Sequence, residues 1–450
     1  MTDPVNRRTF LETAAAGFVA TASSPARAVR QSVPSQVGEI RLADHSLAEL
    51  RDQYKRDLFD DYLPFVDRHV FDHEQGGFMC EVDLDGRLVS TNKSSWFDGR
   101  GLWVYAFLYN HFDRDRRHLE IARKTAEFLL KNQPTAADTL WPKTYTRDGR
   151  ALLDAAGEIY GDLFIAEGFA EYARATGESR YFDLARDLVL KCVRLYDRPD
   201  YRPVIGQTYL GPDARTFPGA RILGAWMVLL RTCTQMLEQK ADAELESIAR
   251  RSSDAIMNAH FNPDFELFNE LLNHDLSRPD NEYAQLVYTG HSVEVSWMLL
   301  REARRREDTA LFDLATARYR RHIAVAWDDV FGGVFRNLQH VERNVWLTDK
   351  VLWAQEEVLI GTLLLVEAGV AWAAEEFSRM YRYVRSTYPL TGRGLPIWMY
   401  AGNRRMEYAS FLAMPRRWEN YHHPRHLMLN LLALDRLAAR PAAARRLPIE

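Results

Sequence analysis

The sequence predicts an all-α fold in which helical hairpins close into a ring, and three observations support this prediction. Apolar residues recur with helical period in about a dozen segments, whereas strand-like alternation is short and confined to residues 78–82 and 334–338. No linker rich in Pro or Ser divides the chain after residue 28. A pattern in the first half of the chain returns in the second half. We therefore expect one domain built of helix pairs.

Each expected helix has an apolar face or a local stop signal. Residues 119–130 place Ile121 and Phe128 on one face, and Gly177 ends the helix expected over 162–176. Short turns with Gly, Pro and Asp separate the segments. The expected helices are 46–63, 96–112, 119–130, 162–176, 181–196, 219–237, 243–259, 291–305, 309–325, 349–368, 371–387 and 424–438.

The repeated pattern joins a glycine turn to a helix start. Residues 72–78 read D-H-E-Q-G-G-F, and residues 93–100 read K-S-S-W-F-D-G-R. Later, residues 328–334 read D-D-V-F-G-G-V, and residues 350–357 read K-V-L-W-A-Q-E-E. We expect equivalent hairpins half a turn apart around a closed ring. Its central cavity would be open at one end, where loops and inner-helix N-termini carry the chemistry.

The N-terminus, residues 1–28, predicts a twin-arginine secretory signal. Arg7 and Arg8 precede an apolar run, and a small-residue cleavage site follows at residues 26–28. The run is too short and too rich in Ala to anchor the protein in a bilayer. We expect the twin-arginine export machinery to deliver a single catalytic domain, residues 29–450, to the periplasm or the exterior.

Composition excludes several classes of partner. The formal net charge of the 450 residues is −4, so no basic excess indicates nucleic acid or an anionic membrane. Cys80, Cys192 and Cys233 are widely spaced and odd in number, so they form neither a disulfide framework nor a metal knuckle. We expect packed thiols in a globular protein, whose oligomeric state the sequence leaves open.

Arg100 stands in the first cluster that suits carbohydrate chemistry. It follows Trp96 by four residues and precedes Trp103 by three, so the three side chains share a helix face. Indole rings can stack on a sugar while a guanidinium binds its oxygens. The alternative is an aromatic core face in which Arg100 forms a structural ion pair.

His291 stands in the second cluster, directly after Gly290 and one helical turn before Glu294. We expect the positive end of the helix to disfavour the imidazolium and keep His291 neutral, as a base requires. Glu294 could orient the ring or bind a sugar hydroxyl. The alternative is a histidine of the helix start or the core without a catalytic role.

His422 and Arg425 stand in a third cluster and share a face if a helix begins there, with Pro424 in its first turn. His422 and His426 are four residues apart and could instead bind a metal. No carboxylate or cysteine nearby in the sequence completes such a site, so we expect no metal.

A fourth cluster, from Lys350 through Trp353 to Glu357, places a carboxylate where the first copy of the repeat has its arginine. A buried or solvated ion-pair helix is the alternative.

These residue types suit one reaction, proton transfer at the carbon next to a carbonyl. Removing that proton requires a neutral base and a donor that stabilises the enediolate oxygen. Two histidines on opposite walls of a cavity, His291 and His422, could invert the centre, while Arg100 holds the oxygen.

In order, these motifs resemble those of the N-acylglucosamine 2-epimerase family, which includes cellobiose 2-epimerases and mannose isomerases. K-x-x-W-x-x-G-R-x-x-W, G-H-x-x-E-x-x-W-x-L, K-x-x-W-x-Q-x-E and [YF]-H-x-P-R-x-L occur across nearly the whole chain after the signal. The resemblance implies an (α/α)6 barrel, a six-hairpin toroid, and proton transfer without metal or cofactor. It assigns catalysis to His291 and His422 and carbonyl binding to Arg100.

The chain also departs from the family pattern. Asp98 replaces the usual Gln, and Arg221 and Gly224 replace the His and Glu of a P-x-x-H-x-x-E helix. Arg221 would favour an acidic or phosphorylated sugar. Trp418 stands near the position of a missing Lys. The expected substrate-binding residues are Arg100, Glu294, Trp353, Glu357, Arg221, Trp96, Trp418 and Arg425.

The sequence is therefore compatible with three functions. The first is a sugar 2-epimerase or an aldose–ketose isomerase, which the sequence does not separate and whose sugar it does not name. The second is an exported glycosidase or lyase that acts on a polysaccharide, with Glu294 and Glu357, and with Asp98 as a further acid, as its carboxylates. The third is a sugar-binding protein without turnover.

Overall fold

The computed structural model describes residues 40–152, 157–203, 215, 217–395, 398, 401–402 and 418–440. All of them belong to one compact unit, Glu39–Glu450. The expected secretory signal lies outside the described residues. Within the described part of the chain, no helix combines the length and the apolar character that crossing a membrane requires.

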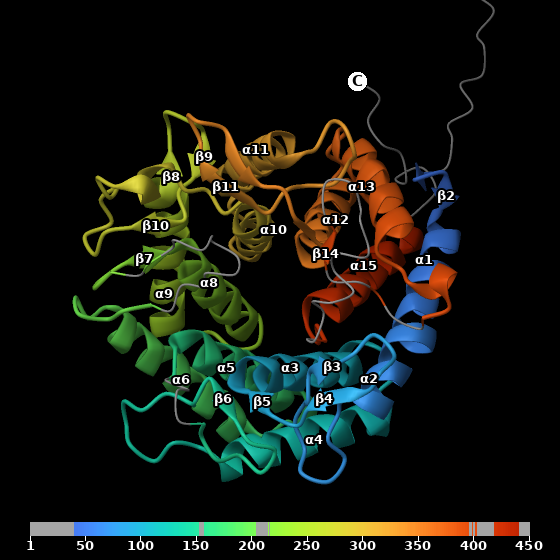
Figure 1. The fold of residues 1–450 in the computed structure, drawn as a ribbon, viewed down its shortest axis with the longest axis vertical. Helices are drawn as coiled ribbons and strands as arrows, with labels where there is room; N and C mark the ends of the chain where they lie inside the picture. Colours follow the sequence, from blue (N-terminus) through green and yellow to red (C-terminus); the bar gives the residue numbers. More distant parts are fainter. Residues whose placement is uncertain are drawn as a thin grey trace, which may run out of the picture. The chain divides into compact units, whose positions relative to one another are not determined.

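An inner ring of helices organises this unit (Figure 1). Each inner helix packs on the next, in the order α3, α5, α8, α10, α12 and α15, and α15 contacts α3 to close the ring. These helices are buried on nearly all sides, as expected for enclosed helices. Their bounds are α3 Ser95–His111, α5 Ile159–Thr176, α8 Leu223–Leu237, α10 Thr289–Arg305, α12 Leu352–Glu367 and α15 His422–Ala439.

An outer helix packs on each inner one, and it buries a single face. Five outer helices follow their inner partners in the chain, whereas α1, near the start of the described chain, packs on the last inner helix, α15. The outer helices are α4 Arg116–Lys131, α6 Ser179–Tyr196, α9 Ala243–Asp254, α11 Thr309–Ala326, α13 Ala373–Thr387 and α1 Leu47–Lys55. The predicted helices and the (α/α)6 barrel are confirmed.

Irregular turns extend two of the outer helices, and sequence signals account for several ends. Ser46 caps α1 through a capping box with Glu49, and Gly177 ends α5 in the left-handed conformation, as predicted. The further helical segments are η2 Arg56–Tyr62, α2 Leu63–His69, η3 Ala255–His260, η4 Glu282–Gln285 and η5 Thr391–Arg393.

Short antiparallel strands connect the helices. The helix expected over 219–237 begins only at Leu223, because Arg221–Ile222 forms strand β7 and pairs with β10, Leu271–Leu272. The other strand pairs are β1 Arg41–Leu42 with β2 His45–Ser46, β3 Glu81–Val82 with β4 Leu88–Ser90, β5 Lys93–Ser94 with β6 Thr144–Tyr145, β8 Phe261–Asn262 with β9 Leu267–Phe268, β11 Asn337–His340 with β12 Val345–Leu347, and β13 Lys350–Val351 with β14 Ala401–Gly402.

The internal repeat folds the same way in both copies. Lys93 Nζ lies 3.0 Å from the Asp72 carboxylate, and Lys350 Nζ lies 2.7 Å from that of Asp328. The paired glycines that follow each aspartate have φ between 75° and 79°, which favours Gly over other residues. The sequence pattern therefore encodes a buried Lys–Asp pair that fixes the start of an inner helix.

The position predicted for the second copy is wrong. The two copies begin α3 and α12, which have only α15 between them on the shorter way around the ring. They are therefore two helices apart, whereas half a turn would place them three apart. Three inner helices, α5, α8 and α10, lie between the two copies along the chain, whereas only α15 follows the second copy.

Candidate active site

The first turns of the inner helices bring the two predicted histidines close to one tryptophan. His291 is the third residue of α10, Trp353 the second of α12 and His422 the first of α15. The Trp353 ring centre lies 6.2 Å from that of His291 and 5.1 Å from that of His422. The His291 side chain is 16% exposed and that of His422 is 8% exposed. The two imidazoles thus belong to one cluster.

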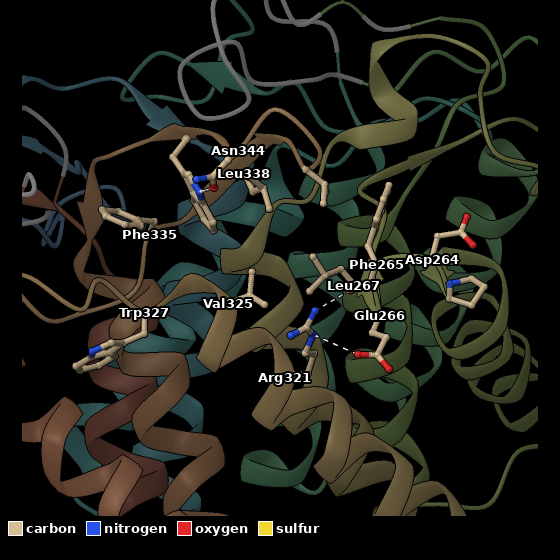
Figure 2. Close-up of a pocket in the computed structure, with 13 residues that line it drawn as sticks. Asp264, Phe265, Glu266, Leu267, Arg321, Val325, Trp327, Phe335, Leu338 and Asn344 are labelled. Carbon is tan, nitrogen blue, oxygen red and sulfur yellow. Dashed lines mark hydrogen bonds and ion pairs between the residues drawn. The ribbon is translucent and has the colours of Figure 1, made fainter. Parts of the chain in front are cut away.

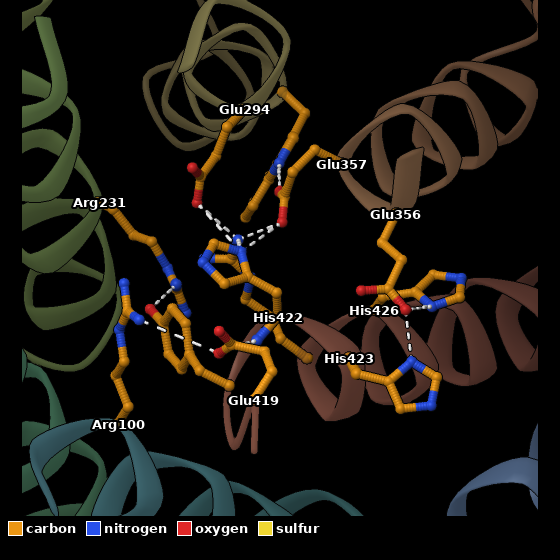
Figure 3. A network of polar contacts seen from close by, with 12 residues as sticks. Arg100, Arg231, Glu294, Glu356, Glu357, Glu419, His422, His423 and His426 are labelled. Carbon is orange, nitrogen blue, oxygen red and sulfur yellow. Dashed lines mark hydrogen bonds and ion pairs between the residues drawn. The ribbon is translucent and has the colours of Figure 1, made fainter. Parts of the chain in front are cut away.

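His422 is held on its Nδ1 side by buried charges (Figure 3). Nδ1 lies 2.9 Å from Glu357 Oε1 and 3.0 Å from Arg425 Nη2. The two protons of that Nη2 already go to Glu294 and Glu357. We therefore assign the Nδ1 proton to His422, which donates it to Glu357 and keeps a lone pair on Nε2. Burial lowers the pKa of His422 to about 3, and the Arg425 charge adds to this effect. The Glu294 carboxylate acts in the opposite direction.

Arg425 neutralises much of the acidity around His422. Its Nη2 lies 2.6 Å from Glu294 Oε1 and also donates to Glu357. Trp297 Nε1 donates to the other Glu357 oxygen at 2.6 Å. Burial opposes the charge of Arg425, but Glu357 and Glu294 raise its pKa. The predicted residues Glu294, Glu357 and Arg425 are therefore brought together beside His422 Nδ1.

His291 has a different partner, Glu270, which sequence analysis missed. His291 Nδ1 lies 2.8 Å from Glu270 Oε1, and the Glu270 carboxylate is fully buried. Burial lowers the pKa of His291, but the Glu270 carboxylate outweighs it and the net pKa is raised. This direction is opposite to the one expected from the helix start, because a buried carboxylate in direct contact outweighs the helix dipole.

The sequence does contain a signal for Glu270. Asn269 and Glu270 stand between two apolar pairs, Leu267–Phe268 and Leu271–Leu272, which form strands β9 and β10. A carboxylate buried between two such pairs requires a partner, because an unpaired buried charge is costly. That partner is His291.

Gly224 lets the histidine approach the neighbouring helices. A Cβ atom on Gly224 would lie 2.8 Å from His291 Cε1 and 2.7 Å from the Tyr160 hydroxyl oxygen. Tyr160 in turn contacts Trp96, with ring centres 5.1 Å apart. Any side chain at position 224 would therefore collide with His291 and Tyr160, so the glycine creates the space in which they lie.

Arg100 lies among aromatic rings on the opposite side of the cluster. Its guanidinium carbon is 4.0 Å from the Phe164 ring centre, 4.8 Å from that of Tyr421 and 5.2 Å from that of Trp96. Nη1 is 4.0 Å from Glu419. Its charge lowers the pKa of both His291 and His422, which places it within electrostatic reach of each.

Trp103 does not flank Arg100 as expected. Its ring lies under Arg231, 4.7 Å from the guanidinium carbon, and its Nε1 donates to Gln235 at 2.8 Å. The spacing of Trp96, Arg100 and Trp103 is compatible with one helix face. Besides Trp96, however, the rings that contact Arg100 are those of Phe164 on α5 and of Tyr421.

Two other predicted residues, Arg221 and Trp418, have packing contacts. Arg221 is buried, donates to the Gly219 carbonyl oxygen at 2.9 Å and lies over Tyr196. The Trp418 ring stacks between those of Phe65 and Tyr62. We leave both residues out of the proposed substrate site.

Asp98 also has a structural position. It accepts from the Phe78 backbone N–H at 2.7 Å and from the Tyr145 hydroxyl, as Gln355 accepts from Val334 N–H at 2.7 Å in the second copy of the repeat. Burial raises the pKa of Asp98 to about 6.

A separate hollow of about 610 Å³ lies on the outer side of the ring (Figure 2). The turn between β8 and β9, helix α11 and the β11–β12 hairpin form it, with Phe265, Trp327 and Trp346 among its lining residues. Arg321 and Glu266 pair across 3.6 Å there. No residue predicted for catalysis or substrate binding lines this hollow, so we place the candidate site at the histidine cluster.

The chain is similar to known proteins over most of its length. The model of the family described as N-acylglucosamine 2-epimerase (GlcNAc 2-epimerase) matches residues 76–424, which include both histidines and Arg100. The N-acylglucosamine 2-epimerase of Bos taurus is 28% identical over 306 residues, a match that covers 64% of this chain and 68% of the bovine protein.

Solved structures show the same fold. The cellobiose 2-epimerase from Bacillus thermoamylovorans superposes with a TM-score of 0.73 at 16% identity, covering 86% of this chain and 99% of that one. A D-mannose isomerase superposes with a TM-score of 0.68 at 14% identity, covering 87% of this chain and 97% of that one.

Proposed function

The chain belongs to the N-acylglucosamine 2-epimerase family, and from this premise we propose that it moves a proton on the carbon next to the carbonyl of a reducing sugar. The product is the 2-epimer of the sugar or the corresponding ketose. The observation that supports this most strongly is the pair of imidazoles around Trp353, one with a lowered and one with a raised pKa. A base and an acid at one site are what the reaction requires.

The first step is removal of the C2 proton from the open-chain sugar. His422 Nε2 accepts this proton, because its ring is neutral and its Nδ1 proton is held by Glu357. The electron pair of the C2–H bond forms the C1–C2 double bond, and the carbonyl electrons move to oxygen. The Arg100 guanidinium stabilises the resulting enediolate oxygen.

The second step returns a proton from the other side. His291, whose proton is stabilised by Glu270, donates it from Nε2. Delivery to C2 on the face opposite His422 gives the epimer. Delivery to C1 gives the ketose, and a hydroxyl proton then passes from O2 to O1. The net charge of sugar and enzyme is the same before and after turnover, with one proton moved from His291 to His422.

The glycosidase alternative has weaker support. Oxygen atoms of Glu294 and Glu357 lie within 4.8 Å of each other, less than the roughly 6.5–9.5 Å that separates the carboxyls of inverting enzymes. One oxygen of each carboxylate is also bound by the same Arg425 guanidinium, so both acids already have a partner within the protein.

We also propose export by the twin-arginine route to the periplasm or the exterior, on the basis of Arg7, Arg8 and the apolar run that follows them. A reporter enzyme fused behind residues 1–28 tests this. The reporter should leave the cytoplasm, and replacing both arginines by Lys should keep it inside.

Incubation with reducing sugars in heavy water tests the chemistry. Glucose, mannose, cellobiose and N-acetylated hexosamines are each followed by proton NMR. We expect one of them to acquire deuterium at C2 with formation of its epimer, or at C1 with formation of a ketose. Absence of deuterium from every sugar, with protein that is folded by circular dichroism, would contradict the proposal.

A further inference from the structure

We infer that Glu356, His423 and His426 form a binding site for a divalent transition-metal ion of the Zn²⁺ type. Glu356 belongs to α12, and the two histidines lie one helical turn apart on α15. One potential ligand atom from each residue lies within 4.8 Å of the other two. Figure 3 shows this trio beside, and separate from, the group around His422.

Distances within the trio suit one ion. Ligands bound at about 2.05 Å to a tetrahedral zinc lie about 3.3 Å apart. Glu356 Oε1 and His426 Nδ1 are separated by 3.4 Å. His423 Nδ1 is closer, because it makes a short hydrogen bond to the same oxygen. Binding replaces the Nδ1 proton of His423 by the cation, so this contact opens to the ligand spacing as the proton leaves.

The trio is buried, and it retains free bonding capacity. The three residues are at most 3% exposed. Among the described residues, Glu356 Oε2 and His426 Nδ1 have no hydrogen-bond partner. Buried polar atoms without a partner are uncommon and indicate an unseen ligand or water. The second Glu356 oxygen can complete the coordination, alone or with a water molecule.

Comparison with the adjacent trio shows why a cation is expected here. Glu294, Glu357 and His422 also have metal-ligand spacing, but the Arg425 guanidinium already lies among them. Among the described residues, the side chains that pair with Glu356 are His423 and His426, and no arginine or lysine forms an ion pair with it. The trio around His422 therefore already contains a cation, the Arg425 guanidinium. The trio of Glu356, His423 and His426 contains none, so a metal ion can take the corresponding position.

Groups around the trio would orient the ligands. His426 Nε2 lies 3.0 Å from the Tyr54 hydroxyl, which also accepts from Asn430 Nδ2 at 3.0 Å. Contacts of this kind fix the ring of a metal-bound histidine and the nitrogen that faces the ion. Two imidazoles and a carboxylate favour Zn²⁺ or a neighbouring transition metal over Mg²⁺ or Ca²⁺.

The site would join two catalytic helices. Glu356 precedes Glu357 on α12, and His423 follows His422 on α15. An ion bound between the outward-facing neighbours holds the inward-facing Glu357 and His422 in register. We assign this ion a structural role and no part in proton transfer.

Zinc titration of the untagged full chain tests the inference. After dialysis against EDTA and removal of the chelator, calorimetry with ZnSO4 should give one ion per chain, and the thermal unfolding midpoint should rise. Glu356→Gln and His426→Gln keep the size of each side chain, and each should weaken binding by at least the ~10–100-fold seen when groups behind the ligands are changed. His73→Gln, at an exposed histidine, should bind as the wild type does.

Two outcomes overturn the site: no zinc binding to the wild type, or binding that both variants retain. If a variant does not fold, anomalous scattering at the zinc edge from crystals of the wild type decides. A peak among Glu356, His423 and His426 supports the site, and a peak elsewhere or none contradicts it. These readouts do not involve turnover, so they stand apart from the test of the proposed function.

Discussion

His422 and His291 occupy equivalent places in the ring, yet their surroundings push their pKa values in opposite directions. Each lies in the first turn of an inner helix, contacts Trp353 and has Nδ1 within 2.9 Å of a buried glutamate. The pKa of His422 is lowered to about 3, whereas that of His291 is raised.

The difference shows that a carboxylate partner does not by itself make a histidine cationic. At His422 burial is the largest cause of the lowered pKa, and the Arg425 charge adds to it against Glu294. The charges acting on Glu270 come chiefly from His291, and a backbone N–H of Gly224 assists. Burial therefore prevails at His422, whereas the Glu270 carboxylate prevails at His291, and the two pKa values move apart as those of paired catalytic groups do in other enzymes.

Removing the base should have the largest effect. His422→Gln should lower kcat by about 10⁴-fold, the upper range for a general base. Exchange of the C2 proton with solvent should fall equally, because His422 starts the reaction. Rates of epimerisation or isomerisation and of deuterium incorporation measure this, with His274→Gln at an exposed position as the control. If the C2 proton still exchanges at the wild-type rate in His422→Gln, His422 is not the base that removes it.

Removing the acid should separate the two half-reactions. His291→Asn keeps a donor toward Glu270 and should lower product formation by about 10³-fold. The C2 proton of the substrate should still exchange with solvent, since His422 remains. Proton NMR in heavy water measures both rates on one sample. Equal loss of exchange and of product formation would show that His422 and His291 do not act separately as base and acid.

The same contrast should appear in stability. Below pH 6.5 the unfolded chain protonates His422, whereas the folded chain does so only near its pKa of about 3. The unfolding free energy therefore falls across this window, by about 2 kcal/mol from this residue at pH 5. The raised pKa of His291 acts oppositely: it adds stability that is complete below pH 6.5 and is lost as pH rises through the folded pKa.

Urea unfolding at pH 7 and pH 5 measures this contribution. His422→Gln should lose less stability than the wild type on acidification. An identical pH dependence of the two proteins would mean that His422 titrates normally in the folded state.

Removing the partner of the acid should have the smallest effect. Glu270→Gln leaves a neutral hydrogen-bond acceptor, so the pKa of His291 should fall and kcat at neutral pH should drop about tenfold. The decline of activity with rising pH should begin at lower pH than in the wild type. Glu266→Gln, at an exposed position four residues earlier, is the control. A pH profile of Glu270→Gln that overlies that of Glu266→Gln would show that Glu270 does not tune His291.

The sequence was sufficient for features that depend on local period or on contiguous motifs. Helical period identified the helices of the ring, and the motifs around His291 and His422 placed both residues at helix starts. Strand β7 was missed because two paired residues have no period that a window can detect.

Features that depend on distant pairing could not be predicted. Glu270 reaches His291 from a loop 21 residues earlier, and no spacing rule connects the two. Arg221 and Trp418 had suitable chemistry, but only packing against Tyr196 and Phe65 decides where their side chains lie. Glu356 likewise meets His423 from another helix, which explains why a carboxylate was not found near these histidines in the sequence.

Titration of the two imidazoles by NMR of ¹⁵N-histidine-labelled protein tests the central claim most directly, with the signals assigned through His422→Gln and His291→Asn. We predict that His291 keeps its proton above pH 6.5 and that His422 stays neutral to below pH 5. Rings that titrate together near pH 6.5, or a His422 that takes up its proton before His291, would contradict the account.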